Sequence, residues 1–463
     1  MNVNPNTNSA LKLLLDGSLA LCRAEQAGIH IDVEYAEKKK LSLTKKIEII
    51  EQTFRETEFY KEWKKSLGGK TPNINSGTQL STFLFKVKKY KSLNSTTSGR
   101  ESADEEALTQ LNIPELTALL KAKKLKKIRD TYLESYLREQ VDGVIHPSFS
   151  LHLVKTYRSG VSMPNVQNIP KRDKLAMQIC RSALFARPDH QLLEIDFSGA
   201  EIRIASCYHK DPNMLKFLTD KTSDMHSELA KQLFLVDNFD KKLPEHNTLR
   251  QAAKSFIFAE FYGDYFKNCA ESLAVKWGKL NKGKWKAGQG VPMPEGTLSD
   301  HLISKGIKSY DAFEKHVQRI EEDFWGNRFK VYASWKEKWW KMYQKKGYVD
   351  FLNGFRCSGL MSKNECINFP IQGTSFLCLL WTLIRTDEIM RMEKWDSRIV
   401  SQIHDSIIVD CNKDELEHVA KTIKHIIQVE LPEHWPWINV PMDADAEVTP
   451  VNGSWSELAK YEI

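Results

Sequence analysis

The sequence predicts an α+β fold, because its strand-like segments are scattered among long helices and do not alternate with them regularly. Segments rich in β-branched and aromatic residues stand at 144–154 and 192–197, and a close pair follows at 398–403 and 406–410. Long helices are expected around 225–236, 248–275 and 311–346. A chain of 463 residues is too long for one compact core, so we expect two or three subdomains.

The first third of the chain is expected to be mostly helical. Residues 9–65 are rich in Lys and Glu, whereas the Gly, Thr, Asn and Ser content of 66–105 favours loops around a short helix, TQLSTFLFKV. A basic helix is expected over 114–140, and its lysines favour either a solvated face or a surface that follows nucleic-acid phosphates. The cluster includes Lys123, Lys124, Lys126 and Lys127. Residues 277–309, rich in Gly and Lys, are expected to form an inserted, mobile surface segment.

The composition narrows the class of protein and its compartment. With 41% hydrophobic and 27% charged residues, the chain can form a core, and global disorder is not expected. The net charge of +7 is compatible with a polyanionic partner, although many proteins without one are equally basic. The eight cysteines form no C-x-x-C pair, which argues against a zinc ribbon or a disulfide framework and for a reducing compartment.

The N-terminal residues and the hydropathy pattern indicate location. No basic leader precedes the first apolar residues, and no run of about 18 apolar residues occurs, so we expect neither a signal peptide nor a membrane span. The expected location is the cytoplasm, at the nucleoid or in the cytoplasm of an infected host.

Two aspartates are candidate metal ligands. Asp196 ends the strand expected at 192–197, and Asp405 lies near the tip of the late hairpin. Each has a simple structural explanation, because Asp caps helices and favours turns. Two strand-end aspartates can nevertheless meet on neighbouring strands, and carboxylates that hold a pair of Mg²⁺ ions are the arrangement that phosphoryl transfer needs.

A cationic and aromatic stripe is expected on one helix. Arg250, Lys254, Phe258 and Tyr262 recur every four residues, so the stripe drifts only about 40° per step. Cations suit triphosphate oxygens, and aromatic rings suit a sugar and a base. An amphipathic helix with its aromatic residues in a core would show the same pattern. Gly263 fits the end of this helix.

Two polar segments add candidates for nucleic-acid contacts. They contain Arg158, Asn165, Gln167 and Asn168 in TYRSGVSMPNVQNIP, and Asn368 and Gln372 in NFPIQGTS. Side chains of these types can bind the nucleic-acid backbone or base edges.

The order of these motifs resembles that of family A DNA polymerases, the group of bacterial DNA polymerase I. The family's D-Y-S-Q-I-E-L-R appears as DFSGAEIR from Asp196, and its R-x-x-x-K-x-x-x-F-G-x-x-Y-G appears, with Ala in place of the first Gly, from Arg250. Its Q-V-H-D-E appears as QIHDS from Gln402, and N-x-P-x-Q-G-T is intact from Asn368. D-P-N-L-Q-N-I-P appears as MPNVQNIP. The resemblance covers roughly residues 18–463.

The resemblance implies a right-hand polymerase fold, with an antiparallel palm sheet and helical fingers and thumb. The implied divisions are an N-terminal segment at 1–19, mainly thumb at 20–143, a first part of the palm at 144–240, fingers at 241–349 with the insert at about 277–309, and a second part of the palm at 350–463.

The resemblance also implies a catalytic centre. Asp196, Asp405 and the backbone carbonyl of Phe197 would hold two Mg²⁺ ions, for which Mn²⁺ can substitute. Arg250 and Lys254 would clamp the β- and γ-phosphates of a dNTP, and Lys254 would also protonate the leaving group.

Further residues would contact the nucleotide and the DNA. His226 would touch the triphosphate, and Glu201 would exclude a 2′-hydroxyl. Phe258 would stack near the sugar, and Tyr262 would close the pocket at the templating base. The implied DNA contacts are Arg158 and Gln372 in the minor groove, His404 at the primer terminus, Asn165, Gln167, Asn168, Asn368 and Gln402 nearby, and Lys123, Lys124, Lys126 and Lys127 on the thumb.

The implied function is template-directed addition of deoxynucleotides to a primer 3′-hydroxyl, by a monomer whose partners are primer–template DNA and dNTPs. Only about 20 residues precede the thumb, so neither a 3′–5′ nor a 5′–3′ exonuclease domain is expected. A separate exonuclease, helicase or processivity factor would supply such functions.

Three departures from the family bear on rate and fidelity: Ser406 replaces Glu, Ile257-Phe258-Ala259 replaces Asn-Phe-Gly, and Gly199 replaces Gln. The closest alternative is a single-subunit, phage-type RNA polymerase, whose third motif also reads H-D-S. Glu201 and the thumb segment oppose it. The other alternative is a catalytically weak, DNA-binding relic of a polymerase, which the presence of both aspartates opposes.

Overall fold

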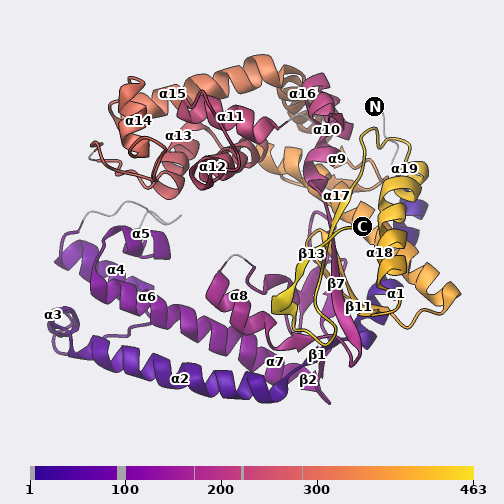
Figure 1. Ribbon diagram of the computed structural model, residues 1–463, viewed down its shortest axis with the longest axis horizontal. Helices are drawn as coiled ribbons and strands as arrows, with labels where there is room; N and C mark the ends of the chain where they lie inside the picture. Colours follow the sequence, from indigo (N-terminus) through magenta and orange to yellow (C-terminus); the bar gives the residue numbers. More distant parts are fainter. Residues whose placement is uncertain (1–5, 91–100, 172, 221–223, 284) are drawn as a thin grey trace.

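The fold is an antiparallel sheet from which two groups of helices extend as arms (Figure 1). Both arms lie on the same side of the sheet, one above the other in the view. The computed structural model describes residues 6–90, 101–171, 173–220, 224–283 and 285–463. Helices and strands segregate as the α+β class requires, so that prediction is confirmed.

The central sheet brings together strands that are far apart in the sequence. In spatial order its strands are β10 (Arg398–Ile403), β11 (Ser406–Asn412), β7 (His190–Phe197), β12 (Ala444–Val448) and β13 (Ala459–Tyr461). All neighbours are antiparallel, and the alignment of β11 on β7 places Ser406 opposite Asp196. The hairpin expected at 398–410 is therefore present, and the earlier strand at 192–197 is its partner.

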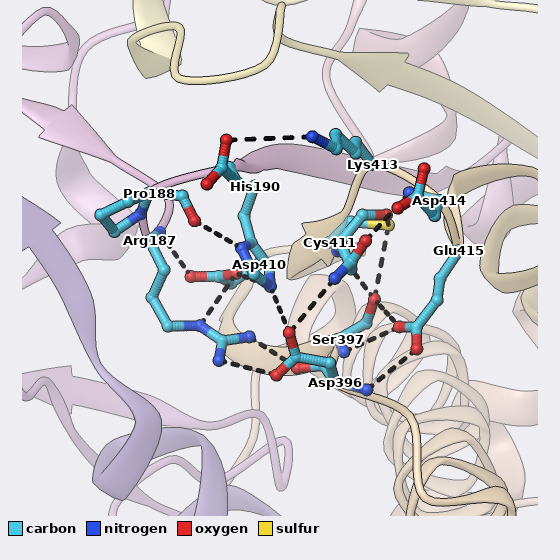
Figure 2. Close-up of polar contacts among 12 residues, drawn as sticks. Arg187, Pro188, His190, Asp396, Ser397, Asp410, Cys411, Lys413, Asp414 and Glu415 are labelled. Carbon is cyan, nitrogen blue, oxygen red and sulfur yellow. Dashed lines mark hydrogen bonds and ion pairs between the residues drawn. The ribbon is translucent and has the colours of Figure 1, made fainter.

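A polar network closes the end of the sheet that is remote from Asp196 (Figure 2). The Arg187 guanidinium donates to Asp396 at 3.0 Å, and its backbone N–H donates to Asp410 at 2.8 Å. His190 Nε2 lies 3.0 Å from a carboxylate oxygen of Asp396. Since these residues join the start of β7, the approach to β10 and the end of β11, the network fixes the three strands on which the site is built.

The long helix α17 (Lys363–Glu393) is the core helix behind the sheet. Ser362 and Glu365 form a capping box at its start. Among the described residues it alone is long and apolar enough to cross a membrane, but 78% of its apolar window is buried inside the protein. Helix α1 (Thr7–Ala27) packs against α17 and β10, so residues 7–27 lie with the sheet, and the division expected at 19/20 falls inside one helix.

The lower arm in Figure 1 contains the basic helix. Its long members are α2 (Val33–Glu56) and α6 (Pro114–Lys127), which pack together, with η2 (Ile128–Leu133) and α7 (Glu134–Glu139) continuing α6. The tip comprises α3 (Glu58–Ser66), α4 (Gly77–Ser81), η1 (Thr82–Val87) and α5 (Glu105–Gln110). Residues 91–100 of the loop expected here lie outside the described residues.

A small sheet joins the lower arm to the region of the central sheet. Its order is β2 (Gln140–Val141), β3 (Val144–Ile145), β1 (Ile29–Ile31) and β6 (Leu184–Phe185). The sequence pattern missed β1, which interrupts the helices expected over 9–65. The strand expected at 144–154 is also divided, into β3 and β4 (Ser148–Ser150), because Pro147 between them has no N–H for a ladder.

Short elements complete the region around the sheet. They are β5 (Gly160–Ser162), η3 (Val166–Asn168), α8 (Lys174–Arg181), α9 (Ala200–His209), β8 (Tyr348–Asp350), β9 (Arg356–Ser358), α18 (Leu416–His425), η6 (Ile426–Glu430), α19 (Leu431–His434) and η7 (Trp455–Glu457).

The upper arm is helical and has its own core. It comprises α10 (Pro212–Thr219), α11 (Met225–Phe234), α12 (Pro244–Phe261), α13 (Phe266–Glu271), η4 (Ser272–Trp277), α14 (Leu298–Ser304), α15 (Tyr310–Asp323), η5 (Phe324–Arg328) and α16 (Lys330–Lys346). Because α10 and α11 share this core, the arm begins before the division expected at residue 241. The helices expected at 248–275 and 311–346 are each divided, the first after Phe261 and the second at η5.

The segment 277–309 was expected to be a surface insert, and the structure corrects this. Leu280, Met293, Leu298 and Leu302 are all at most 8% exposed and belong to the core of the upper arm. Helix α14 starts with a capping box at Thr297. The segment is therefore packed into the arm, because its apolar residues belong to the arm's core, while Lys279, Lys282, Lys286, Lys305 and Lys308 are exposed.

Candidate active site

The sheet brings the two candidate aspartates together. Asp405 occupies the two-residue turn between β10 and β11, and Asp196 lies opposite Ser406, the first residue after that turn. The backbone N–H of Phe197 donates to the carbonyl of Asp405 at 3.1 Å. His404, with φ of 51°, adopts the left-handed conformation that starts the turn. Two carboxylates from distant motifs thus stand side by side at one sheet end.

The charges of this pair suit a divalent cation. Burial, and then the negative charge of Asp405, raises the pKa of Asp196 to about 6. Within the described residues no group of three or more His, Cys, Asp and Glu side chains is arranged to hold a metal. Two carboxylates and a carbonyl fit Mg²⁺, which keeps waters and substrate phosphates among its ligands.

A cavity of about 910 Å³ opens in front of the aspartates. We call it the carboxylate cavity; its wall on the sheet side includes Asp196, Asp405 and Glu201, and its wall on α12 includes Lys254, Phe258 and Tyr262. The acidic wall and the cationic, aromatic wall come from opposite sides of the cavity. A ligand that carries phosphates and a base matches both walls.

The stripe on α12 lies as the four-residue spacing predicts, but its first cation already has a partner. Arg250 Nε lies 3.1 Å from Asp224 Oδ2, and Asp224 also caps α11. Lys254 Nζ lies 5.8 Å from the centre of the Phe258 ring. Burial, and then the charges of Arg250 and Lys254, lowers the pKa of His226 to about 4, so this imidazole is neutral at neutral pH.

Arg158 and Glu201, predicted for separate roles, are bonded to each other. The Arg158 guanidinium donates to a Glu201 oxygen and lies 4.0 Å from Asp405. Burial raises the pKa of Glu201, and Arg158 opposes that rise. Gly373 on α17 holds this region close, because a Cβ there would lie 2.1 Å from the Phe351 ring and 2.5 Å from the Thr156 carbonyl.

Gln402 does not lie where a direct DNA contact requires. Its side chain is 1% exposed, accepts from Ser159 Oγ at 2.6 Å and donates to the His404 carbonyl at 2.6 Å. Gln167 donates to the same Gln402 oxygen at 3.1 Å. The role of Gln402 is therefore to hold the turn and the Gln167 segment, since burial keeps it from a duplex.

A second cavity, of about 780 Å³, lies between the lower arm and the sheet. We call it the lysine cavity; it is lined by Lys123, Lys124, Lys127, Gln167, Asn168 and His404, among others. Lys124 forms an ion pair with Asp173. Lys126 lies outside this lining and pairs with Glu51 instead, so the predicted lysine cluster is split between two faces of α6.

The remaining predicted residues lie at the end of α12 and in the Asn165 turn. Asn368 donates to the Tyr262 carbonyl at 3.2 Å, and Gln372 follows one turn later on α17. Asn165 caps η3 by accepting from the Asn168 N–H at 3.2 Å. Asn165 and Asn368 therefore form hydrogen bonds with the backbone in the free protein.

A family model described as DNA polymerase family A matches residues 40–457. The chain belongs to DNA polymerase family A. Among curated relatives, DNA polymerase I of Aquifex aeolicus is 29% identical over 426 residues, which are 89% of this chain and 63% of that protein. The thermostable DNA polymerase I of Thermus thermophilus is 25% identical, over 92% of this chain and 46% of its own length. The DNA polymerase of Bacillus phage SP01 is 22% identical, over 94% of this chain and 50% of its own length.

Solved structures agree on the fold of this family A chain. The POL domain of Pol1 from M. smegmatis, in a complex with DNA primer-template and dNTP, superposes with a TM-score of 0.73 at 22% identity. The match covers 96% of this chain and 70% of that chain. The fold is therefore the right-hand polymerase fold, whose palm is the antiparallel sheet; below, the upper arm is called the fingers and the lower arm the thumb. The chain spans less than two thirds of the curated relatives named above.

Two departures from the family motifs have a structural setting. Gly199 adopts φ of 60° at the N-cap of α9, a conformation in which glycine is unstrained. Ser406 lies 3.4 Å from Glu194, a carboxylate 4% exposed on β7, two residues before Asp196. Nothing in the structure explains the replacements at Ile257 and Ala259.

Four charged residues beside the site were missed by motif reasoning. Glu194 pairs with Lys171 at 3.2 Å and lies 3.8 Å from Arg181, while Asp445 stands opposite Asp196 and accepts from Ser198 Oγ at 2.7 Å. The buried, mostly apolar run at 192–197 contains Glu194 inside the strand. An acidic residue in an otherwise apolar strand was the signal that could have found it.

Proposed function

We propose that this chain is a template-directed DNA polymerase that adds deoxynucleotides to a primer 3′-hydroxyl by two-Mg²⁺ phosphoryl transfer, without degrading DNA itself. Asp196, Asp405 and the Phe197 carbonyl would hold the metal ions. Bound Mg²⁺ would lower the pKa of the primer hydroxyl and neutralise charge on the triphosphate. Family membership and the paired aspartates support this proposal.

The protein's own side chains would position the nucleotide and distinguish a deoxyribose from a ribose. Lys254, which lines the carboxylate cavity, would hold triphosphate oxygens and donate a proton to pyrophosphate. Arg250 would exchange Asp224 for a phosphate. Phe258 and Tyr262 would bracket the sugar and base, while Glu201 would exclude a 2′-hydroxyl.

The observation that carries the proposal is the turn between β10 and β11. Its two residues face different cavities, since His404 lines the lysine cavity and Asp405 lines the carboxylate cavity. A primer held by the thumb lysines would therefore end beside the metal ligands. That juxtaposition is required if a strand terminus is to react with a bound nucleotide.

The test is primer extension on a primed DNA template with Mg²⁺, with deoxynucleotides or ribonucleotides in parallel and a labelled primer without nucleotides. We expect full-length products only with deoxynucleotides and an undegraded primer without them. Asp405→Asn should slow extension roughly a thousandfold or more while binding of primer–template persists. Asp414→Asn, an exposed change at the far end of the sheet, is the matched control and should extend normally.

The results separate the alternatives. Products with ribonucleotides would favour the RNA polymerase, which Glu201 and the family match oppose. No extension by the unmodified chain, with retained DNA binding, would favour the polymerase relic. A shortened primer would reveal an exonuclease activity and remove that part of the proposal.

A further inference from the structure

One lysine in the carboxylate cavity belongs to none of the motifs that define the site. Lys276, at the end of η4, lines the same cavity as Asp196, Asp405 and Lys254. It lies immediately before the segment 277–309, whose sequence suggested only a surface role. Its side chain is exposed, as a cation that awaits a ligand must be.

The packing of η4 fixes the backbone position from which Lys276 reaches the cavity. Leu273 and Ala274 are each 1% exposed and belong to the core of the fingers, and the neighbouring Trp277 packs against that core and also lines the cavity. Helix η4 packs directly on α12, the helix that carries Lys254. Lys276 is thus presented from a rigid element, and ordering it costs only side-chain entropy.

Other lysines of this region have partners or lie elsewhere. Lys282 pairs with Glu271 at 2.7 Å, and Lys305 pairs with Asp237 at 2.6 Å. Among the ion pairs of the described residues, neither Lys276 nor the exposed Lys279 takes part. Lys279 does not line the carboxylate cavity. The two lysines therefore differ in whether they face that cavity, and Lys279 also lies outside η4 with a left-handed φ of 56°.

The charge of the cavity indicates the ligand. Asp196, Asp405 and Glu201 make the palm wall acidic, so that wall repels phosphates unless metal ions intervene. The lysines on the opposite wall are Lys254 from α12 and Lys276 from η4. A polyphosphate that lies between the walls would be held by both lysines.

We propose that Lys276 binds the phosphates of the incoming nucleotide and so is a second lysine contact, beside Lys254, in the nucleotide site. This inference rests on the proposed function, because it takes the carboxylate cavity to be that site. Phosphates of a DNA strand carry the same chemistry, and the experiment below distinguishes the two sources. The cavity favours the nucleotide because it contains the metal ligands and the α12 stripe.

The decisive measurement is the Kd for a correct dNTP on a complex with a dideoxy-terminated primer, where no chemistry occurs. The chain as it stands is compared with Lys276→Ala, Lys276→Arg and the matched control Lys279→Ala. We expect Lys276→Ala to raise the Kd for the dNTP about tenfold and to weaken competition by inorganic pyrophosphate similarly. Lys276→Arg should stay near the original value, and Lys279→Ala should be unchanged.

A second arm measures the Kd for primer–template without nucleotide. We expect no change in any of the three variants. If Lys276→Ala weakens primer–template binding and leaves the Kd for the dNTP unchanged, the lysine serves a DNA strand and the inference is overturned. Equal nucleotide affinity in all variants overturns it as well. Because binding is read without catalysis, a chain that fails to extend primers would refute the proposed function while this test still stands.

Discussion

At the residue scale, two arginines of the site are paired with carboxylates inside the protein. Arg250 is held by Asp224, and Arg158 is held by Glu201. Arg250 is therefore free for another anion only if it leaves Asp224, and Arg158 only if it leaves Glu201. Such resting pairs lower apparent affinity but keep buried charges compensated in the free protein. Removal of Glu201 would therefore have two effects: it would enlarge the carboxylate cavity and leave Arg158 without its carboxylate partner.

The first prediction concerns sugar selection by Glu201. Glu201→Ala opens space beside Phe258 and also frees Arg158, so we expect ribonucleotide incorporation to rise about tenfold or more, with slower deoxynucleotide addition. Glu201→Gln keeps the volume and loses the charge. If exclusion is steric, Glu201→Gln should retain the original selectivity.

The measurement is the ratio of kcat/KM for a deoxynucleotide and its ribonucleotide on one primer–template. Equal ratios in the unmodified chain and Glu201→Ala would show that another residue excludes the 2′-hydroxyl. A high ribonucleotide rate in both variants would instead assign selectivity to the charged pair with Arg158.

Motif reasoning located the residues whose identity is tied to local sequence, but it could not assign burial. The spacing identified Asp196, Asp405 and Lys254, and the structure gathers all three around one cavity. Gln402 shows the limit of this reasoning. Its place in the motif predicted a DNA contact, but the residue is only 1% exposed. The contact of Glu194 with Ser406 became visible only in the folded sheet, because it depends on the register of β11 on β7 and not on sequence spacing.

At the element scale, long periodic helices and the late hairpin were predictable, whereas short strands and helix breaks were not. The three-residue strand β1 exists because β3 and β6 flank it, a partnership across more than a hundred residues of sequence. The segment 277–309 was mistaken for a surface insert because of its many Gly and Lys residues, whereas spaced apolar residues pack it into the core: Leu280, Met293, Leu298, Leu302 and Ile307. Contacts with distant parts of the chain therefore determine both the strand β1 and the packing of 277–309.

The second prediction concerns how α9 is fixed against the fingers. His209 on α9 is 5% exposed, stacks on Tyr332 of α16 at 4.0 Å, and its Nδ1 accepts the Asp211 N–H at 2.9 Å. Burial, and then the charge of Lys336, lowers the pKa of His209 to about 3. The folded protein therefore keeps this imidazole neutral, while the unfolded chain protonates it below about pH 6.5.

The stability from His209 is complete above pH 6.5 and is lost as pH falls toward 3. We expect a loss of about 2–3 kcal/mol between pH 6.5 and 4.5 from this group. Urea unfolding followed by tryptophan fluorescence reports it, since Trp335 lies beside the ring. His209→Gln should flatten this pH dependence, and the exposed control His425→Gln should retain it. An unchanged slope in His209→Gln would mean that other groups carry the acid sensitivity.

At the scale of the whole molecule, the palm joins two cavities that lie under different arms. The carboxylate cavity lies under the fingers, the lysine cavity lies beside the thumb, and the β10–β11 turn contributes to both. The polar network around Asp396 fixes the far ends of the same strands (Figure 2). The arrangement explains why residues from opposite ends of the chain are needed for one site.

The last prediction tests which face of the thumb helix follows the DNA. Lys127 lines the lysine cavity, whereas its neighbour Lys126 pairs with Glu51 and bonds Asn75 at 3.0 Å. If a duplex occupies that cavity, Lys127→Ala removes one phosphate contact, and the slope of log K against log salt should fall by about 0.9 in magnitude.

Fluorescence anisotropy of labelled primer–template across a salt series gives this slope. Lys126→Ala is the matched control, one residue away with the same charge change, and we expect it to leave the slope unchanged and to lower thumb stability slightly through the lost pair with Glu51. A fall in slope for Lys126→Ala and none for Lys127→Ala would place the DNA on the other face of α6. Equal effects from both would mean that the helix attracts DNA by its total charge, without a defined track.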